Sequence, residues 1–347
     1  MIDYSRLKKL ISIPSPSGFE KKLIDYIQKE LGKNCEVDYH NNLVFTLKGK
    51  NPDKIVMIDA HADQLGFLIN NVDKEGMITL CPIGGHDLSL IRGRSVTVIS
   101  DKGTFNGVID VKPIHLMDSY NDEVPDKTTD VCLDLGIRKR DKVLKYIGIG
   151  DPVVLKPVYD DLLENYVTGS GFDDKAGCFI LMEVIKAIKK LKRKPEVTLK
   201  FVFSSQEEVG CFGSREVARK TNPDLFIGVD VGFATDYPNV EEKEPGLCSL
   251  GSGMIVAKGI NIYRPAVSLL ETISKRNKIP IQYVATDGTG TNAGSVSHAC
   301  GGFRILDLGI PLRNMHSPVE VLHKKDLESS IKLLTKLLLS KRLGDIL

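Results

Sequence analysis

The sequence predicts an α/β fold in which helices cover a sheet and a small β-rich domain is inserted. After Gly171 the chain alternates between helical and strand-like patterns. Residues 66–163 instead contain short strand-like runs separated by glycines, with little helical periodicity. The run KIVMIDA, which ends just before His61, is rich in Ile and Val and is typical of a buried strand.

Length and charge limit the classes of protein to which the chain can belong. At 347 residues it exceeds the usual size of one domain, so we assign 1–65 and 164–347 to a discontinuous α/β domain and 66–163 to the inserted domain. The 47 basic and 45 acidic residues give a formal charge of +2, which provides no large field of one sign. We therefore expect neither nucleic acid nor a membrane surface as a partner.

The first predicted element is a helix from about Gly18 to Leu31. Ser17 and Glu20 have the spacing of a capping box, in which each side chain accepts a hydrogen bond from a backbone N–H of the first turn. Apolar residues then recur at helical spacing and predict a stripe that faces the core: Phe19, Leu23, Ile24 and Ile27.

The later elements follow the alternation that predicts the fold class. AGCFILMEVIKAIKKL is a predicted helix, and VTLKFVFSS and LFIGVDV are predicted buried strands. The segments ISKRNKIPIQYVAT and FRILDLGI continue the pattern, and LHKKDLESSIKLLTKLLLSKRL is an amphipathic helix near the end of the chain.

Cysteine usage and the first residues predict a cytoplasmic protein. The seven cysteines form no CxxC pair, and an odd number suits a reducing compartment, so we expect them to be small buried hydrophobic residues. The opening MIDYSRLKKLISIPSPSG lacks the charged, apolar and small-residue pattern of a secretory leader. No segment reaches about 18 consecutive apolar residues, the length expected of a membrane span.

Acidic residues and histidines lie at the ends of several predicted strands. In open α/β sheets the carboxyl ends of the strands face the ligand crevice, so side chains that are far apart in the sequence can converge there. The residues in question are His61 and Asp63, Asp173 and Asp174, Glu207 and Glu208, Asp230, and His316.

This set of side chains favours a metal site over a phosphate site. Imidazole nitrogen and carboxylate oxygen are ligands of zinc and similar ions, and two such ions can share a carboxylate and a water. Because neighbours in an extended segment point in opposite directions, one of Glu207 and Glu208 could ligate a metal while the other serves as the base. Singly, each residue is more often a hydrogen-bonded histidine or a surface charge, and it is their recurrence beside buried strands that favours the metal.

The motifs HADQLGF, SGFDDKAG, SSQEEVG, GVDVGFATDYP and IPLRNMHSP, in this order, resemble those of the tetrahedral aminopeptidases. This group is also described as the glutamyl aminopeptidase and endoglucanase-like metallopeptidase family. The resemblance runs from about His61 to Val319. It implies a mixed sheet flanked by helices, of the co-catalytic zinc exopeptidase type, and it implies that the inserted domain mediates dimerisation.

The resemblance also implies a role for each candidate residue. Asp173 would bridge two metal ions, and the peptide bond that follows it would be cis. His61 and Asp230 would complete one coordination sphere, and Glu208 and His316 the other. Glu207 would be the general base. Asp63 would hydrogen-bond the imidazole of His61 from behind and fix its tautomer.

The implied cofactors are two divalent ions per subunit, with zinc expected and cobalt or manganese as alternatives. The implied substrates are short peptides with a free N-terminus, from which a metal-bridged water would release the first residue. The implied assembly is a homo-oligomer in which dimers form a dodecamer shaped as a hollow tetrahedron. The sequence does not name the preferred first residue, which varies among acidic, neutral and basic in the family.

Some positions depart from the family pattern or have weaker claims to function. Gln64 replaces a glutamate, Asn292 lies where Thr-Asp-Ala is common, and the following histidine is displaced to His298, which leaves the substrate preference and part of the pocket wall open. We expect surface positions for His40 and His323, and packing or assembly roles for His86 and His115. Cys211 has no base at suitable spacing and is expected to be structural.

Three other functions remain as alternatives. An N-acyl amino acid deacylase could use the same metals and would differ only in not needing a free amine. A glycosidase needs two carboxylates that face each other across a sugar, which neighbouring glutamates do not provide, and it would leave the histidines without a task. A non-catalytic scaffold would have no need for Glu207 beside a full set of ligands.

Overall fold

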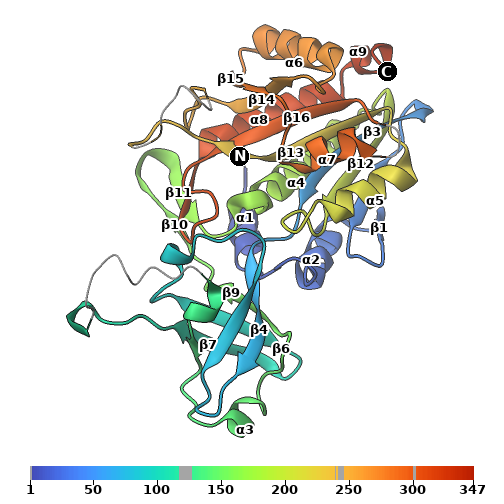
Figure 1. The fold of residues 1–347 in the computed structure, drawn as a ribbon. Helices are drawn as coiled ribbons and strands as arrows, with labels where there is room; N and C mark the ends of the chain where they lie inside the picture. Colours follow the sequence, from blue (N-terminus) through green and yellow to red (C-terminus); the bar gives the residue numbers. More distant parts are fainter. Residues whose placement is uncertain (1, 117–126, 239, 241–245, 300–301) are drawn as a thin grey trace.

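The computed structural model describes residues 2–116, 127–238, 240, 246–299 and 302–347. An α/β unit forms the larger part of the molecule, and a small β-barrel projects from it (Figure 1). The barrel follows directly after the strand that carries His61, so the two parts meet beside the candidate site.

A mixed sheet forms the centre of the α/β unit, as the sequence and the resemblance predict. Its middle strands are parallel to one another and almost entirely buried, which explains their unbroken apolar runs. The strands in spatial order are β1 (Cys35–Val37), β2 (Leu43–Leu47), β12 (Val197–Ser204), β3 (Asn51–His61), β13 (Leu225–Phe233), β16 (Ile305–Leu312), β14 (Met254–Gly259) and β15 (Ile281–Thr286).

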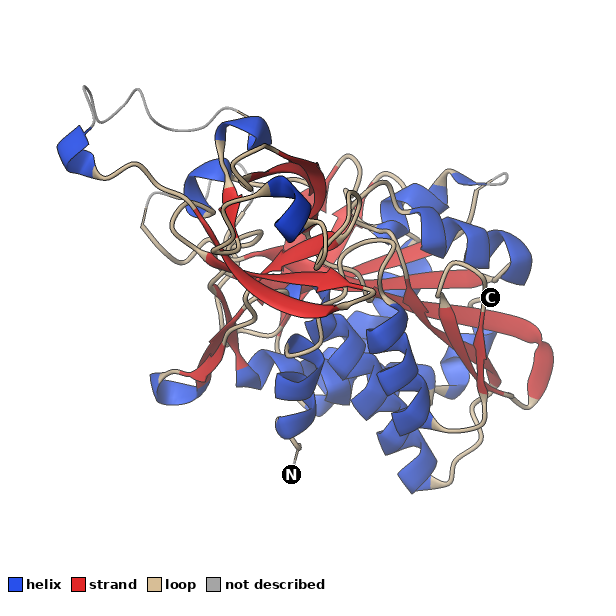
Figure 2. Cartoon of the chain, turned by 90° about the horizontal axis from the view of Figure 1, so that it is seen from below, coloured by secondary structure: helices blue, strands red, loops and turns tan. Residues whose placement is uncertain are grey.

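Helices cover both faces of this sheet. On one face α4 (Phe172–Leu191) and α8 (Lys324–Leu338) pack against the central strands, joined by α1 (Ser5–Ile11) and α6 (Arg264–Asn277). The other face carries α5 (Phe212–Thr221) and α7 (Asn292–Ser297). The larger helix group lies on one side of the strands in Figure 2. Two further helices are α2 (Lys21–Leu31), which packs on β2, and α9 (Lys341–Asp345).

The barrel closes on itself and has its own apolar core. Its antiparallel strands follow the order β4 (Gly66–Val72), β5 (Ile78–Ile83), β8 (Leu133–Asp134), β7 (Gly103–Ile109), β6 (Ser95–Ser100) and β9 (Pro152–Leu155). Its strands fall within the range predicted for the inserted domain, which also contains α3 (Arg140–Val143) and the short 3₁₀ turns Leu88–Leu90, Ile114–Leu116 and Thr128–Asp130. A further 3₁₀ turn, Leu163–Asn165, crosses the predicted boundary at residue 163. Beyond the barrel, β10 (Tyr159–Asp161), β11 (Tyr166–Gly169) and β17 (Glu320–His323) form a separate small sheet.

No helix in the described ranges combines the length and the apolar character needed to cross a bilayer.

The predicted start of the first long helix is wrong. The helix begins at Lys21 rather than Gly18, and Ser17 and Glu20 form no capping box. The hydroxyl of Ser17 donates to Asp63 Oδ2 at 2.6 Å, while Glu20 Oε1 accepts from the backbone N–H of Gly18 at 2.6 Å. Phe19 is 42% exposed and lies outside the core stripe. A tertiary partner, Asp63, has replaced the local cap.

Two other expectations about burial need correction. Cys178, Cys211 and Cys248 are buried as expected, but Cys81 is exposed and Cys35 and Cys132 are only partly covered. Cys300 lies outside the described residues. His323, expected at the surface, is buried because it ends β17 and caps α8, where its Nδ1 accepts from the N–H of Lys325 at 3.0 Å.

Candidate metal centre

Six of the eight acidic residues and histidines predicted at strand ends line one cavity of about 460 Å³. His61 is the last residue of β3, and Asp230 lies in the adjacent strand β13. The remaining side chains come from the first turn of α4, the loop after β12 and the loop after β16. The cavity is lined by His61, Asp173, Glu207, Glu208, Asp230 and His316 among others. The shared carboxyl edge of the parallel strands brings them together.

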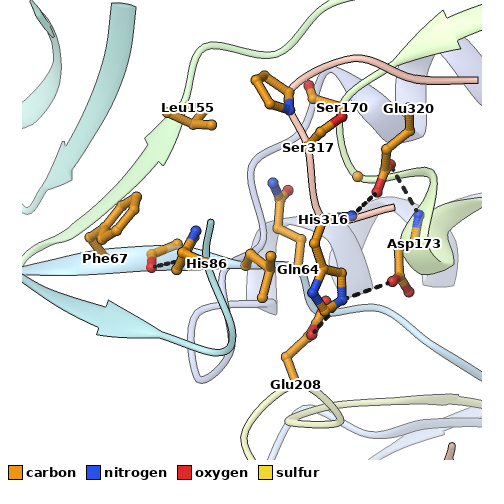
Figure 3. Close-up of a pocket in the computed structure, with 14 residues that line it drawn as sticks. Gln64, Phe67, His86, Leu155, Ser170, Asp173, Glu208, His316, Ser317 and Glu320 are labelled. Atoms are coloured by element: carbon orange, nitrogen blue, oxygen red, sulfur yellow. Dashed lines mark hydrogen bonds and ion pairs between the residues drawn. The ribbon is translucent and has the colours of Figure 1, made fainter. Parts of the chain in front are cut away.

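Asp173 lies between the two histidines. Its Oδ1 is 3.0 Å from His61 Nε2, and its Oδ2 is 3.3 Å from His316 Nε2. His316 also approaches Glu208 Oε2 at 3.6 Å, and Figure 3 shows these three side chains pointing toward one another. One carboxylate that offers one oxygen to each side is the arrangement that two neighbouring metal ions require of a shared ligand.

The donor set fits divalent ions. Potential ligand atoms of His61, Asp173 and Glu208 lie within 4.8 Å of one another, and so do those of His61, Asp174 and Asp230. Glu208 Oε1 is buried, and no described residue hydrogen-bonds to it. A buried carboxylate oxygen without a partner is costly, and a cation would satisfy it. Nitrogen and oxygen ligands of this kind suit zinc, cobalt or manganese.

The electrostatics of the cluster also call for positive charge. Burial raises the pKa values of Glu208 and Asp230 well above their usual range, and the neighbouring Asp173 carboxylate raises both further. Burial disfavours the charged form of His61, but Asp173, Asp63 and Asp230 outweigh it and raise the pKa of His61 well above its usual value. The site thus contains several carboxylates, but the only positive charge among its described side chains is that of its histidines when protonated.

Asp63 links His61 to the glutamate loop. Its Oδ1 is 3.4 Å from His61 Nδ1 and accepts from the N–H of Glu207 at 2.9 Å, while Oδ2 accepts from the N–H of Glu208 at 3.1 Å. The ring nitrogen lies slightly closer, at 3.1 Å, to the backbone oxygen of Asp63. One buried carboxylate thus positions both a histidine and the two glutamates.

The glutamate pair is not extended, contrary to the expectation. Gln206 has a left-handed backbone with φ of 57°, and residues 207–210 form a turn that leads into α5, closed by a 2.9 Å hydrogen bond from the N–H of Gly210 to the backbone oxygen of Glu207. Glu207 and Glu208 therefore differ in direction because of the turn and of their bonds to Asp63, not because of strand alternation. Both side chains still line the cavity.

Asp174 lies in the first turn of α4, and its side chain hydrogen-bonds two backbone N–H groups. The Asp173–Asp174 bond is cis, as the resemblance implied. Asp174 Oδ2 accepts from the N–H of His61 at 3.1 Å, and its Oδ1 accepts from the N–H of Gly177 at 3.0 Å. Asp174 thereby connects the start of α4 to the end of β3.

Sequence reasoning missed Glu320, which lies at the start of β17. Its Oε2 accepts from the N–H of Phe172 at 2.6 Å and of Asp173 at 3.4 Å, and its Oε1 accepts from the N–H of His316 at 3.2 Å (Figure 3). This buried carboxylate therefore ties the backbone of the central aspartate to that of the outer histidine. The only signal for it was an acidic residue directly before the apolar run VLH.

Two of the three departures from the family pattern, Asn292 and Gln64, lie in buried networks, whereas His298 is exposed. Asn292 donates to Asp59 Oδ2 at 2.7 Å and to Ser204 Oγ at 3.0 Å, and it does not line the cavity. The side-chain oxygen of Gln64 accepts from the buried Lys175 ammonium and from the N–H of Ser15. His298 lies at the end of α7, where its ring contacts Ser297.

His86 lies closer to the site than expected. It stacks on Phe67, with ring centroids 4.1 Å apart, and its Nε2 lies 2.7 Å from the backbone oxygen of Gly66. Together they line a small pocket that also reaches Asp173, Glu208 and His316 (Figure 3). The barrel therefore forms one wall of the site.

The comparisons agree on one group of proteins. A family model described as M42 glutamyl aminopeptidase matches residues 41–333. A putative aminopeptidase of Acetivibrio thermocellus is 32% identical over 339 residues, which cover 96% of this chain and 97% of that protein. A lysyl aminopeptidase of Pyrococcus furiosus is 29% identical over 345 residues, with 97% of each chain covered. The structure of the Pyrococcus horikoshii TET1 peptidase superposes with a TM-score of 0.87 at 30% identity, over 97% of this chain and 99% of that one.

Proposed function

Because the chain belongs to the M42 glutamyl aminopeptidase family and is therefore a metallo-aminopeptidase, we propose that it releases the first residue from short peptides with a free N-terminus. The observation that carries the proposal is the position of Asp173, with one carboxylate oxygen beside His61 and the other beside His316. This geometry supports two metal ions that share one ligand.

In the proposed site Asp173 is the shared ligand. His61 and Asp230 complete the inner ligand set, and Glu208 and His316 complete the outer one. Two divalent ions bound there would supply an acidified water and a positive charge opposite the oxyanion of the transition state. Nitrogen and oxygen donors make zinc the expected metal, with cobalt or manganese as alternatives.

Glu207 is the proposed general base. It lines the cavity, is not among the proposed ligands, and is held by the bond from its own N–H to Asp63. Burial raises the pKa of its carboxyl group, which favours acceptance of a proton from the attacking water. Glu207 then returns this proton to the nitrogen of the departing amine, so that a neutral amine leaves.

The site supports the alternatives less well. The two histidines beside Asp173 have no task in glycoside hydrolysis. A non-catalytic scaffold would not need Glu207 next to a complete donor set. A deacylase would use the same groups, and the state of the substrate amine separates it from an aminopeptidase.

The test is hydrolysis of matched short peptides with free and acetylated N-termini. Protein loaded with zinc or cobalt is compared with the same protein stripped by a chelator. Release of the first residue from free peptides only, and only by the loaded protein, supports the proposal. Cleavage of the acetylated set would identify a deacylase, and cleavage of neither set would contradict both.

A substitution of Glu207 tests the proposed division of roles. Glu207→Gln should lower kcat by about 10² to 10⁴-fold, the usual contribution of a proton-transfer group. Metal content, measured by mass spectrometry, should stay at the wild-type value because Glu207 is not a proposed ligand. The exposed Glu75→Gln in the barrel is the matched control. A Glu207→Gln protein that had lost its metals would show that this residue is a ligand.

Assembly and location complete the proposal. The P. horikoshii TET1 peptidase can assemble into a tetrahedron or a large octahedral shell, which supports a homo-oligomer here. We assign dimerisation to the inserted domain 66–163, which leaves 1–65 and 164–347 as the catalytic domain, and we expect the dimers to form a dodecamer. The free thiols of the described cysteines suit a cytoplasmic protein. Native mass spectrometry of wild-type protein would give the subunit number directly.

A further inference from the structure

A second pocket, of about 280 Å³, adjoins the cavity of the metal centre. It lies over the face of the sheet where β13, β16, β14 and β15 meet, under the loop that precedes α7. The two spaces share part of their lining: Val231, Gly232, Phe233, Gly290 and Thr291. A side chain that starts at the metal centre can therefore enter the second pocket without crossing a separate wall.

Glycines keep the route between the two pockets open. Asp230, a proposed ligand, pairs in register with Gly309 of β16, and Gly232 lies beside Gly309 on the neighbouring strand. Neither glycine places a side chain over this part of the sheet. Asp307 precedes Gly309 by two residues and so points to the same face, about 7 Å further along the strand.

Asp307 is the only acidic side chain that lines the described part of this pocket. Its two carboxylate oxygens each lie 3.3 Å from the hydroxyl of Thr291, and Thr289 adds a second hydroxyl contact. Within the described residues no Lys, Arg or His forms an ion pair with it. Burial raises the pKa of Asp307 to about 6, so the group is largely ionised at neutral pH. A buried charge of this kind is costly until a cation reaches it.

The remaining lining is mostly apolar. Ile255, Ala257 and Val284 form the far wall. An aliphatic stem that ends in a cation can pack along such a wall while its head reaches the carboxylate. An acidic side chain would meet Asp307 as a like charge and would be rejected.

We propose that this second pocket receives the side chain of the first residue of the peptide, and that Asp307 selects a basic residue, lysine or arginine. The inference rests on the proposed aminopeptidase activity and specifies its substrate class. Asp307 acts on specificity only, since it lies outside the donor set of the metal centre.

The test compares wild type with Asp307→Asn on four substrates, the para-nitroanilides of lysine, arginine, leucine and glutamate. Wild type should prefer the two basic substrates. Loss of a charge-assisted bond should lower kcat/KM for lysine and arginine by about 10- to 100-fold in Asp307→Asn, with the leucine value unchanged within about threefold. Asp307→Glu should retain the basic preference, and Asp287→Asn, exposed on the nearby loop, is the matched control.

Direct binding provides a measurement that does not require turnover. Calorimetry should show that wild type binds L-lysine more tightly than L-norleucine, which has a similar stem but no ammonium group, and that Asp307→Asn removes this difference. A wild-type preference for leucine or glutamate would overturn the inference and leave the aminopeptidase activity standing. Equal losses on every substrate would instead show that Asp307 only supports the loop. If no substrate is cleaved, the proposed activity fails, and equal binding of lysine and norleucine would then overturn the inference separately.

Discussion

The two sides of Asp173 are built differently. The inner side, His61 and Asp230, is carried by adjacent strands in the middle of the sheet, and the His61 side chain is only 2% exposed. The outer side, Glu208 and His316, is carried by the loops after β12 and β16, and the His316 side chain is 38% exposed. The core of the fold fixes the inner ligands, whereas hydrogen bonds from the backbone N–H groups of the outer ones to Asp63 and Glu320 position the outer ligands. Half of the site is thus part of the core and half depends on two buried carboxylates.

The largest effect should follow from removing the group that both sides share. Asp173→Asn should lower kcat by more than about 10⁴-fold, the upper end for a single proton-transfer group, because it weakens both ligand sets. Metal content, measured by mass spectrometry, should fall with activity. The exposed Asp101→Asn is the matched control. Retention of full metal content would show that the two sides do not depend on a common carboxylate.

The two histidines should differ in their effect on the metal-free fold. His61→Ala should lower the free energy of unfolding by about 3 to 5 kcal/mol, because it leaves the buried Asp63 carboxylate without its cation and leaves Asp173 with His316 alone. His316→Ala should cost less than about 1 kcal/mol, because water reaches this side chain. Urea unfolding in the presence of a chelator measures both, with the exposed His40→Ala as control. Equal losses would remove the distinction between the inner and outer sides.

Glu20, a buried neighbour of Asp63, provides a test that depends on pH. Burial and the neighbouring Asp63 raise its pKa from 4.5 to about 7 in the folded protein. Between these values the folded state binds more protons than the unfolded state, so wild-type stability should fall as pH rises from about 4.5 to 7. Glu20→Gln removes this titration, and its advantage over wild type should grow across the same range to about 3 kcal/mol.

Urea unfolding of Glu20→Gln at a series of pH values measures this advantage, and the exposed Glu36→Gln should show no such trend. A pH-independent difference between Glu20→Gln and wild type would mean that Glu20 is not under electrostatic strain in the folded protein.

Asp63, which connects the inner side to the outer one, should affect the metal centre less than Asp173 does. Asp63→Asn should lower metal affinity or activity by about 10- to 100-fold, the usual effect of changing a group behind a metal ligand. The amide cannot accept from the N–H groups of both Glu207 and Glu208, so the glutamate loop should shift as well. Competition with a chelating dye measures the affinity. Ser17→Ala, which removes only one donor to Asp63, should change it less.

The central sheet could be predicted from the sequence, and the loop-borne side of the site only in part. Buried parallel strands carry unbroken apolar runs, so VTLKFVFSS and LFIGVDV were identifiable without a structure. The turn at Glu207 and Glu208 was not, because its bonds go to Asp63, which is far away in the sequence. For the same reason the expected cap at Ser17 failed and Glu320 was missed. Local patterns do not reveal a partner that lies 46 residues away, as for Ser17, or more than a hundred, as for Glu207 and Glu320.

The order of the strands has a consequence for synthesis on the ribosome. His61 leaves the ribosome early, but its strand β3 lies between β12 and β13, which follow more than a hundred residues later. His316 is the last of the five proposed ligands along the chain. A nascent chain therefore has no complete donor set until His316 has been made, and a chain that stops before His316 should not hydrolyse peptides. Because the proposed ligands are spread along the chain, only a chain that extends through His316 can form the whole metal centre.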